Sequence, residues 1–325
     1  MAYQPPQSVA AGPPYLRLRF ECLGQAGSAD ERALDGPIVR RVLGRALIER
    51  FCPFGRPLCE EPEGPETPVE RCDLARCCPY GVLFAGSLTA RPPFALFVPL
   101  RAVGPSTPVE LTLFGPGVNV FAWAVEAVVR ALAAGIGARR RPYRVSRVIR
   151  VGPDGSTATL GEGPNPLPPR IEADRLVPTS ERVDAEAPAL VEFLSPARLK
   201  AEGRLLKGPG APPFAVLVAR VLDRYRDLFG QDVGDVVRPA LRGTTLALAR
   251  RVEVLVDEVE WIEVEDYSAR QGQELRLGGK AGRVLYGPGA GAFLPILRLG
   301  EVLHVGKNAA SGCGRMAVPL APGSR

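Results

Sequence analysis

The fold of this chain is restricted most by a pattern of elements that occurs twice. An apolar helix, a glycine turn with cations and a strand follow one another around GIGARRR (135–141) and again around GKNAASGCGR (306–315). The two copies agree in pattern and not in residue identity, which indicates repeated structural units. We therefore expect two related domains. That number suits 325 residues, because domains usually contain roughly 100–200 residues.

The first half predicts the order strand, helix, two strands, helix and strand. The alternating stretch PYLRLRFECL (14–23) predicts the first strand. Asp35 as a cap, with Pro37 in the first turn, predicts a helix over 37–51. The later elements are the strands ALFVPLRAV and PVELTLFG, a helix over 118–134, and the strand RPYRVSRVIRV. This order is that of a ferredoxin-like unit.

Both helices of the first half have an apolar face. Its residues are Ile38, Val42, Leu43, Ala46 and Leu47 in the first helix, and Phe121, Val125, Val128, Val129 and Leu132 in the second. This pattern leaves Arg41 and Arg45 one turn apart on another face of the first helix.

The second half predicts a comparable series. It contains a strand at ALVEFLSP, a long helix at PFAVLVARVLDRYRDLFG that Gly230 closes, and strands at RRVEVLVDEVEWIEVED and ELRLGGKAGRVLYG. Within the last of these, GGKAG is a hairpin signal. A short apolar helix over 290–303 and the strand CGRMAVPL complete this half.

We therefore predict an α+β fold with two tandem ferredoxin-like (RRM-like) domains and a glycine-rich loop near the C-terminus. A disordered tail over 1–13 precedes a first domain over 14–160, which a cysteine-rich insertion over 52–78 interrupts. A glycine- and proline-rich linker over 161–187 leads to the second domain over 188–325.

The charge of the chain suits two interpretations. A net charge of +6 and an isoelectric point near 9.1 fit either a polyanionic partner or plain solubility. The N-terminal stretch MAYQPPQSVAAGPP has no basic start followed by an apolar core. We also expect no apolar run near the roughly 20 residues that span a membrane, and therefore a cytoplasmic chain.

Five of the seven cysteines lie between Cys52 and Cys78. An odd number of cysteines in a cytosolic chain argues against a disulfide framework. The candidate thiolate ligands of a structural zinc ion are Cys52, Cys59, Cys72 and either Cys77 or Cys78, with Cys78 preferred. Their spacing includes no paired C-x-x-C, so reduced thiols or a disulfide are the alternative.

The stretch HVGKNAASGCGRM (304–316) contains the only histidine of the chain. Its glycines, Gly306, Gly312 and Gly314, allow positive φ and a close approach of backbone amides to phosphate, and Lys307 and Arg315 add charge. A simple turn is the alternative. The spacing is not that of a Walker motif, so we expect no nucleoside triphosphate.

This stretch resembles the C-terminal glycine-rich motif of the CRISPR-associated endoribonucleases that process precursor CRISPR RNA, members of the RAMP superfamily. Four further stretches resemble the same family in the same order: IVRRVLGRALIERFC, CCPYGVLF, VNVFAWAVEAVVRALAAGIGARRR and VEFLSPARLKAEGRLL. The resemblance covers most of the chain over 14–318. It implies two ferredoxin-like domains with CRISPR repeat RNA across a basic surface.

The resemblance also implies an activity. It is metal-independent cleavage within the repeat, in which a ribose 2′-hydroxyl attacks the adjacent phosphate and leaves a 2′,3′-cyclic phosphate, with no catalytic cofactor. The product is a guide RNA, and other CRISPR effector subunits are expected partners. The acidic run over 253–266 should form a strand that faces away from this RNA, and Trp261 should be a core residue.

Cleavage of this kind needs a base, an acid and positive charge on the transition state. His304 is the imidazole candidate, with a helix-terminal structural role as the alternative. Many members of the family place the working histidine on the first helix, whereas this helix offers arginines, among them Arg41 and Arg45. Arginine is a poor proton shuttle but stabilises a charged transition state. Tyr80 is a further hydroxyl donor or a core residue.

Two groups of residues are expected to contact RNA. Those of the glycine-rich stretch are Gly306, Lys307, Asn308, Ser311, Gly312, Gly314 and Arg315, and those after the first glycine turn are Arg139, Arg140, Arg141 and Arg144. A solvated charged edge is the alternative for the second group. Three functions are therefore compared: a repeat-cleaving endoribonuclease, a non-catalytic RNA-binding subunit, and a metal-stabilised protein-interaction module.

Overall fold

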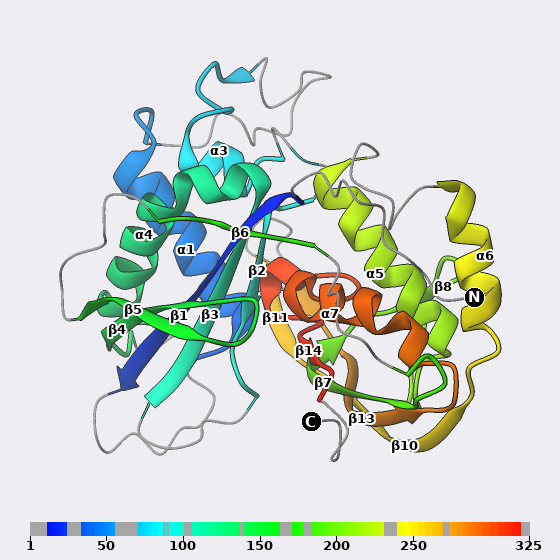
Figure 1. Cartoon of the computed structure of the whole chain (residues 1–325). Helices are drawn as coiled ribbons and strands as arrows, with labels where there is room; N and C mark the ends of the chain where they lie inside the picture. The colour runs from blue at the N-terminus through cyan, green and yellow to red at the C-terminus, as the bar shows by residue number, and fades with distance from the viewer. Residues whose placement is uncertain are drawn as a thin grey trace.

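Two antiparallel sheets lie side by side in the structure, a computed structural model, and helices cover each of them (Figure 1). The structure describes residues 12–24, 34–55, 71–86, 89, 91–100, 106–136, 140–162, 171–177, 184–230, 239–268 and 273–319. The first sheet and its helices come from the first half of the chain, and the second sheet and its helices come from the second half. This division confirms the predicted pair of domains.

The first sheet has the strand order β2-β3-β1-β4-β5. Its strands are β1 (Pro14–Gly24), β2 (Phe94–Phe97), β3 (Ser106–Phe114), β4 (Tyr143–Val151) and β5 (Thr157–Glu162), and the two-residue strand β6 (Asp174–Arg175) also pairs with β1. Leu18 of β1 lies opposite Leu111 of β3, and Phe20 lies opposite Val148 of β4. These apolar side chains belong to the first hydrophobic core.

Helices of the first half pack on this sheet. They are α1 (Gly36–Phe51), the short α3 (Pro79–Leu83), the 3-10 helix η2 (Gly115–Val120) and α4 (Phe121–Ala133). The start of α1 is as predicted, because the Asp35 carboxylate accepts a hydrogen bond of 2.7 Å from the Ile38 amide. The buried face is rotated from the expected one: Val39, Leu43 and Leu47 are fully buried.

The second sheet repeats the topology of the first, since its order β10-β13-β7-β14 places the strands in the same relative positions. Its strands are β7 (Ala189–Ala197), β10 (Val254–Ile262), β13 (Gly279–Tyr286) and β14 (Met316–Ala317). Its helices are α5 (Phe214–Phe229), α6 (Pro239–Ala249), η4 (Gly291–Phe293), α7 (Leu294–Leu303) and η5 (Ala309–Ser311), of which α6 was not predicted. Two small hairpins, β8 (Lys200–Ala201) with β9 (Arg204–Leu205) and β11 (Glu265–Ser268) with β12 (Gln273–Arg276), complete the second half.

Two predictions for the second half were wrong. GGKAG is not a hairpin turn, because Gly279 begins β13 and this strand continues between β10 and β7. Gly279 permits close approach instead: a Cβ there would lie 2.8 Å from the carbonyl carbon of Pro196. Trp261 is not a core residue, since it is half-buried and its Nε1 donates a hydrogen bond to Glu263.

The first sheet also contributes to the core of the second half. Tyr15, Ala95 and Phe114 are buried, and they belong to the hydrophobic cluster that contains the residues of α5 and α7. Phe114 and Phe229 of α5 pack edge to face with their ring centroids 6.2 Å apart. The two halves therefore share part of one hydrophobic core and do not merely touch at their surfaces.

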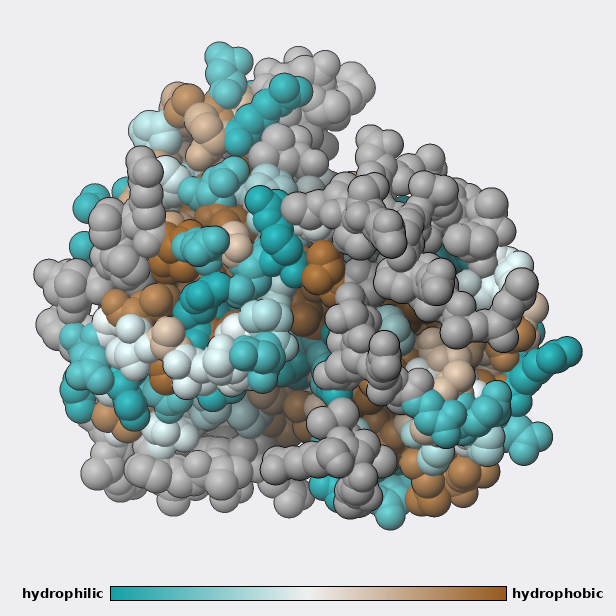
Figure 2. All heavy atoms as spheres, viewed as in Figure 1, coloured by the Kyte–Doolittle hydropathy of each residue, from teal (hydrophilic) through white to brown (hydrophobic). Residues whose placement is uncertain are grey.

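The edge of the second sheet exposes apolar side chains on β10. Val254, Leu255 and Val256 are 39%, 53% and 46% exposed. In the space-filling view, a hydrophobic area lies at the lower right, where Figure 1 has β10 (Figure 2). Acidic residues of the same strand are exposed beside these side chains, so β10 is an open, acidic edge.

One helical stretch, Gly115–Ala133, is long and apolar enough to cross a membrane by length and composition alone. This finding corrects the expectation that no run of this kind exists. In the structure, buried residues of its α4 part, among them Val125 and Leu132, pack in the core of the first domain. The stretch is therefore a core helix of the described fold.

Candidate nucleic-acid interface

The glycine-rich stretch forms a loop that folds back on itself after α7. The amide of Val305 donates a hydrogen bond of 2.7 Å to the carbonyl of Gly314, and the Gly314 amide donates one of 3.1 Å to Pro196 of β7. Gly314 has a φ of 78°, and a Cβ there would collide with the carbonyl oxygen of Val305. The positive φ expected for this glycine is therefore confirmed, and its backbone is used for packing within the protein.

The same loop contacts the first helix of the other domain. Gly36 of α1 lies so close to the loop that a Cβ on it would be 2.5 Å from the carbonyl oxygen of Ser311 and 2.6 Å from the Cα of Gly312. Ala310 is buried in the core of the first domain. The loop therefore joins the two halves at the N-terminus of α1, and this contact leaves no room there for side chains.

Part of the loop remains at the surface. Lys307 and Asn308 are exposed, and Asn308 has the left-handed φ of 65°. The Asn308 carbonyl accepts hydrogen bonds from the amides of Ser311 and Cys313, which turn the chain back into the protein. Of the predicted contact residues in this stretch, Lys307 and Asn308 are thus the most accessible to a ligand.

Lys307 lies among other cations. Its amide donates a hydrogen bond of 3.0 Å to the carbonyl of Arg198, directly after β7. The cations Lys200, Arg91 and Arg198, together with partial burial, lower the pKa of the Lys307 ammonium, and Lys200 is the first of these causes. We call Arg91, Arg198, Lys200 and Lys307 the cation cluster. Sequence reasoning missed its first three members, although Arg198 and Lys200 alternate in SPARLK.

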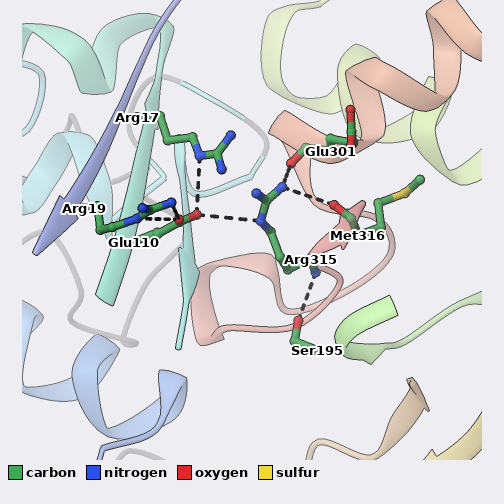
Figure 3. A network of polar contacts seen from close by, with 7 residues as sticks. All are labelled: Arg17, Arg19, Glu110, Ser195, Glu301, Arg315 and Met316. Carbon is green, nitrogen blue, oxygen red and sulfur yellow. Dashed lines mark hydrogen bonds and ion pairs between the residues drawn. The ribbon is translucent and has the colours of Figure 1, made fainter. Parts of the chain in front are cut away.

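A buried network of charges lies behind the loop (Figure 3). The Glu110 carboxylate on β3 pairs with Arg17 at 3.3 Å, Arg19 at 2.9 Å and Arg315 at 3.7 Å. Burial raises the pKa of Glu110, but the guanidiniums of Arg17, Arg315 and Arg19 outweigh it and hold the pKa below its usual value. The network therefore carries more positive than negative charge and connects β1, β3 and the loop.

Arg315 is not the surface cation that the sequence suggested. It is buried, its guanidinium donates hydrogen bonds to the carbonyls of Glu301 and Met316, and its amide donates to Ser195 Oγ at 2.9 Å (Figure 3). Burial, helped by Arg17, lowers the pKa of Arg315 to about 10. The residue fixes the loop to the first sheet, and it does not reach the surface as an RNA contact.

His304 is also buried, with 2% of its surface exposed. Its amide caps α7 by donating to Gly300, and its Nδ1 has no hydrogen-bond partner among the described residues. Burial, with the nearby Arg315 and Arg224, lowers its pKa well below the ordinary value. The ring is therefore neutral and shielded, which contradicts the expected exchange of protons with a substrate and favours the structural alternative.

The remaining catalytic candidates separate into two kinds. Arg41 and Arg45 are exposed on α1, and Arg45 Nε forms an ion pair of 2.6 Å with Glu49. Tyr80 is buried and stacks on Phe84 with their ring centroids 5.2 Å apart, which agrees with the core interpretation. Of these candidates, only the two arginines present a charged group at the surface of the helix.

The arginines after the first glycine turn are partly accessible. Arg140, with a φ of 46°, and Arg144 on β4 are exposed. Arg141 is half-buried, and its backbone pairs with that of Ile136. Arg139 lies outside the described residues, so its predicted contact stays a prediction.

The predicted zinc ligands are described only in part. Cys52 follows α1 and donates its amide to Ile48, and Cys72 and Cys78 are half-buried against the first core. Cys59 lies outside the described residues. Within the part of the chain that the structure describes, no three His, Cys, Asp or Glu side chains are arranged to hold a metal ion. A site that includes Cys59 stays a prediction.

Family models match both halves of the chain. Residues 191–316 match the model described as CRISPR-associated endoribonuclease Cas6, and this match includes the glycine-rich loop. Residues 13–171 match a second model, described as an N-terminal domain. No curated protein sequence matches the chain.

Solved structures resemble the whole fold. The Cas6 (TTHB231) product complex is 17% identical, covers 94% of this chain and 99% of its own, and has a TM-score of 0.54. The Cas6 (TTHA0078) product complex has the same identity and coverage and a TM-score of 0.50. A partial Cas6-RT-Cas1–Cas2 complex is 12% identical with a TM-score of 0.52, and it matches 97% of this chain and 47% of its own. At these identities the likeness shows a shared fold.

Proposed function

We propose that this chain is a CRISPR-associated endoribonuclease of the Cas6 type that binds and cleaves CRISPR repeat RNA to make guide RNA. The observation that carries the proposal is the family match over residues 191–316, which includes the loop that meets α1 and exposes Lys307. The RNA would lie across this loop and the exposed face of α1, near Arg41 and Arg45.

The proposed reaction needs no metal ion. The 2′-oxygen of one ribose attacks the adjacent phosphorus, its proton leaves to solvent or a nearby base, and the bond to the 5′-oxygen of the next nucleotide breaks as that oxygen gains a proton. The products are a 2′,3′-cyclic phosphate and a 5′-hydroxyl. Arg41, Arg45 and Lys307 would stabilise the negative charge of the transition state, and alignment of the 2′-hydroxyl with the phosphate would supply much of the rate.

Cleavage in the presence of EDTA tests this proposal. Purified protein and its own repeat RNA should give one cut, and treatment of the upstream product with a cyclic phosphodiesterase should change its mobility. Arg41→Ala and Arg45→Ala should each slow single-turnover cleavage, whereas Arg50→Ala, at the other end of α1 and paired with Glu126 at 3.2 Å, should not. Cleavage that occurs only with an added divalent ion would contradict the metal-independent route.

A second function is a non-catalytic RNA-binding subunit of a CRISPR effector complex. The burial of His304, the only histidine, favours it, because no imidazole is then available for proton transfer. Binding of the repeat without cleavage, with and without divalent ions, would support this function. Absence of binding would favour the protein-interaction module.

We also propose a kind of partner protein and a structural zinc ion. The name of a similar structure, the Cas6-RT-Cas1–Cas2 complex, describes Cas6 with other CRISPR proteins, and we extend this kind of partner to the present chain in the cytoplasm. Zinc in the cysteine-rich insertion would be structural, with no role in cleavage. Elemental analysis of untagged protein tests it, since less than about a tenth of an equivalent would leave only reduced thiols or a disulfide.

A further inference from the structure

The cation cluster lies where elements from both halves meet. Arg198 and Lys200 follow β7, Lys307 belongs to the glycine-rich loop, and Arg91 precedes β2 of the first sheet. Within this cluster, Lys200, Arg91 and Arg198 are the charged side chains that act most strongly on Lys307, and all three are positive. Like charges held together by a fold cost free energy unless an anion offsets them.

Backbone contacts fix the positions of these side chains. Residue 307 pairs with residue 198 in an isolated antiparallel bridge, and the Gly306 backbone lies against the Arg198 carbonyl, where a Cβ would be 2.5 Å from the oxygen. Lys200 begins β8 two residues after Arg198, and side chains two apart in extended chain share a face. The backbone therefore places Lys200 and Lys307 on the same face, with Lys307 in the bridge and Lys200 two residues beyond Arg198.

The two arginines of the cluster are already anchored. Arg198 Nη1 donates a hydrogen bond of 2.6 Å to the carbonyl of Gly278, and Arg91 pairs with Asp227 at 3.1 Å. The Arg198 anchor is a neutral carbonyl and the Asp227 carboxylate is paired with Arg91, so neither anchor supplies a carboxylate that is paired with the two ammonium groups. A small anion with several acceptor oxygens would bridge both ammonium groups at once, and a phosphate group has this form.

We propose that Lys200 and Lys307 bind one and the same phosphate group of the RNA backbone, with Arg198 and Arg91 adding positive charge around it. This inference rests on the proposed RNA binding and extends it, because it adds Lys200, Arg198 and Arg91 to the interface and assigns a shared ligand to two lysines. The ligand class is a phosphate group, which either the RNA or a small phosphate compound can present.

The test measures the salt dependence of RNA affinity. With repeat RNA that carries a 2′-deoxy substitution at the cut, Lys200→Ala should weaken binding roughly tenfold and lower the slope of log affinity against log salt by about 0.7. Lys307→Ala should do the same, and the double variant should lose little more than either single one, because both remove the same contact. Lys207→Ala is the matched control, since it removes an exposed lysine near the same hairpin.

The outcomes separate this inference from the proposed function. If the protein cleaves the repeat, two results overturn the shared site and leave the proposed function intact. One is a slope of log affinity against log salt that is the same for Lys200→Ala and Lys207→Ala. The other is that the affinity losses of Lys200→Ala and Lys307→Ala are fully additive in the double variant. If the chain does not bind repeat RNA, the melting temperature with and without inorganic pyrophosphate shows whether the phosphate site exists. The phosphate site alone is supported if pyrophosphate stabilises the unaltered protein and Lys200→Arg but does not stabilise Lys200→Ala. The site is overturned if pyrophosphate does not stabilise the unaltered protein.

Discussion

Glu110 is the carboxylate on which three arginines from both halves converge, so replacing it tests how the halves are held together. In Glu110→Gln the side chain keeps its shape and an acceptor oxygen but loses its charge. Arg17, Arg19 and Arg315 would then lie near one another without this counter-charge. We expect the variant to fold with a lower free energy of unfolding.

The magnitude follows from burial. Removing one partner of a buried ion pair costs about 3–5 kcal/mol, because it leaves a buried charge uncompensated. The Glu110 and Arg315 side chains are 6% and 9% exposed, but those of Arg17 and Arg19 are 16% and 32% exposed, so water screens part of the remaining charge. We therefore expect the low end, about 3 kcal/mol, which corresponds to a fall in melting temperature of about 6 °C at roughly 2 °C per kcal/mol.

Urea and thermal unfolding, followed by circular dichroism, measure this effect. The matched control is Glu49→Gln, which removes an exposed carboxylate paired with Arg45 and should leave the melting temperature unchanged within error. Because the pKa of Glu110 is lowered in the folded protein, its contribution is present above the unfolded-state pKa and is lost as the pH falls through the folded-state pKa. The difference between the wild type and Glu110→Gln should therefore shrink in acid.

A melting temperature for Glu110→Gln equal to that of Glu49→Gln at neutral pH would refute the reasoning. So would a difference that stays constant down to strongly acidic pH, because a protonated Glu110 and a glutamine carry the same charge. Either result would mean that the ion pairs of Glu110 contribute little to joining the two halves.

Three further predictions follow from the loop and its surroundings. Gly36→Ala should lower the free energy of unfolding, measured in urea, by about 1–3 kcal/mol, since its Cβ would lie 2.5 Å from the Ser311 carbonyl oxygen. The control Gly243→Ala in α6, whose Cβ would have no atom within 4 Å, should raise it by about 0.5–1 kcal/mol. Effects of the same sign would contradict this prediction. The pH profile of single-turnover cleavage should keep its shape in His304→Gln, because the buried ring is neutral throughout; a lost inflection near the histidine pKa would restore its catalytic role. RNA affinity should fall as the pH rises through the lowered pKa of Lys307, because bound phosphate favours the charged ammonium. Fluorescence anisotropy between about pH 7 and 10 measures this fall, and Lys307→Arg should remove it.

Local signals in the sequence were sufficient for most elements. Asp35 and Pro37 specify the start of α1 by their own hydrogen bond and backbone angle, and these depend on adjacent residues alone. The repeated order of elements likewise predicted both ferredoxin-like domains. GGKAG was misread because a glycine needed for close packing and a glycine needed for a turn look alike in a sequence.

The site could be predicted only where side chains act alone. Lys307 was correctly expected at the surface of the loop, since it is flanked by small and polar residues. His304 and Arg315 were misplaced because their burial depends on partners far along the chain, among them Glu110 on β3. Arg91 was missed for the same reason, as only the fold brings it near Lys307.

The shared core has a consequence for how such a protein can evolve. Because Tyr15, Ala95 and Phe114 of the first sheet are buried among residues of the second half, either half expressed alone would expose apolar surface that its partner normally covers. Recombination that exchanges one domain for a homologue would have to preserve this packing as well as the ion pairs. The two halves are therefore expected to be inherited as one unit and to acquire compensating substitutions together.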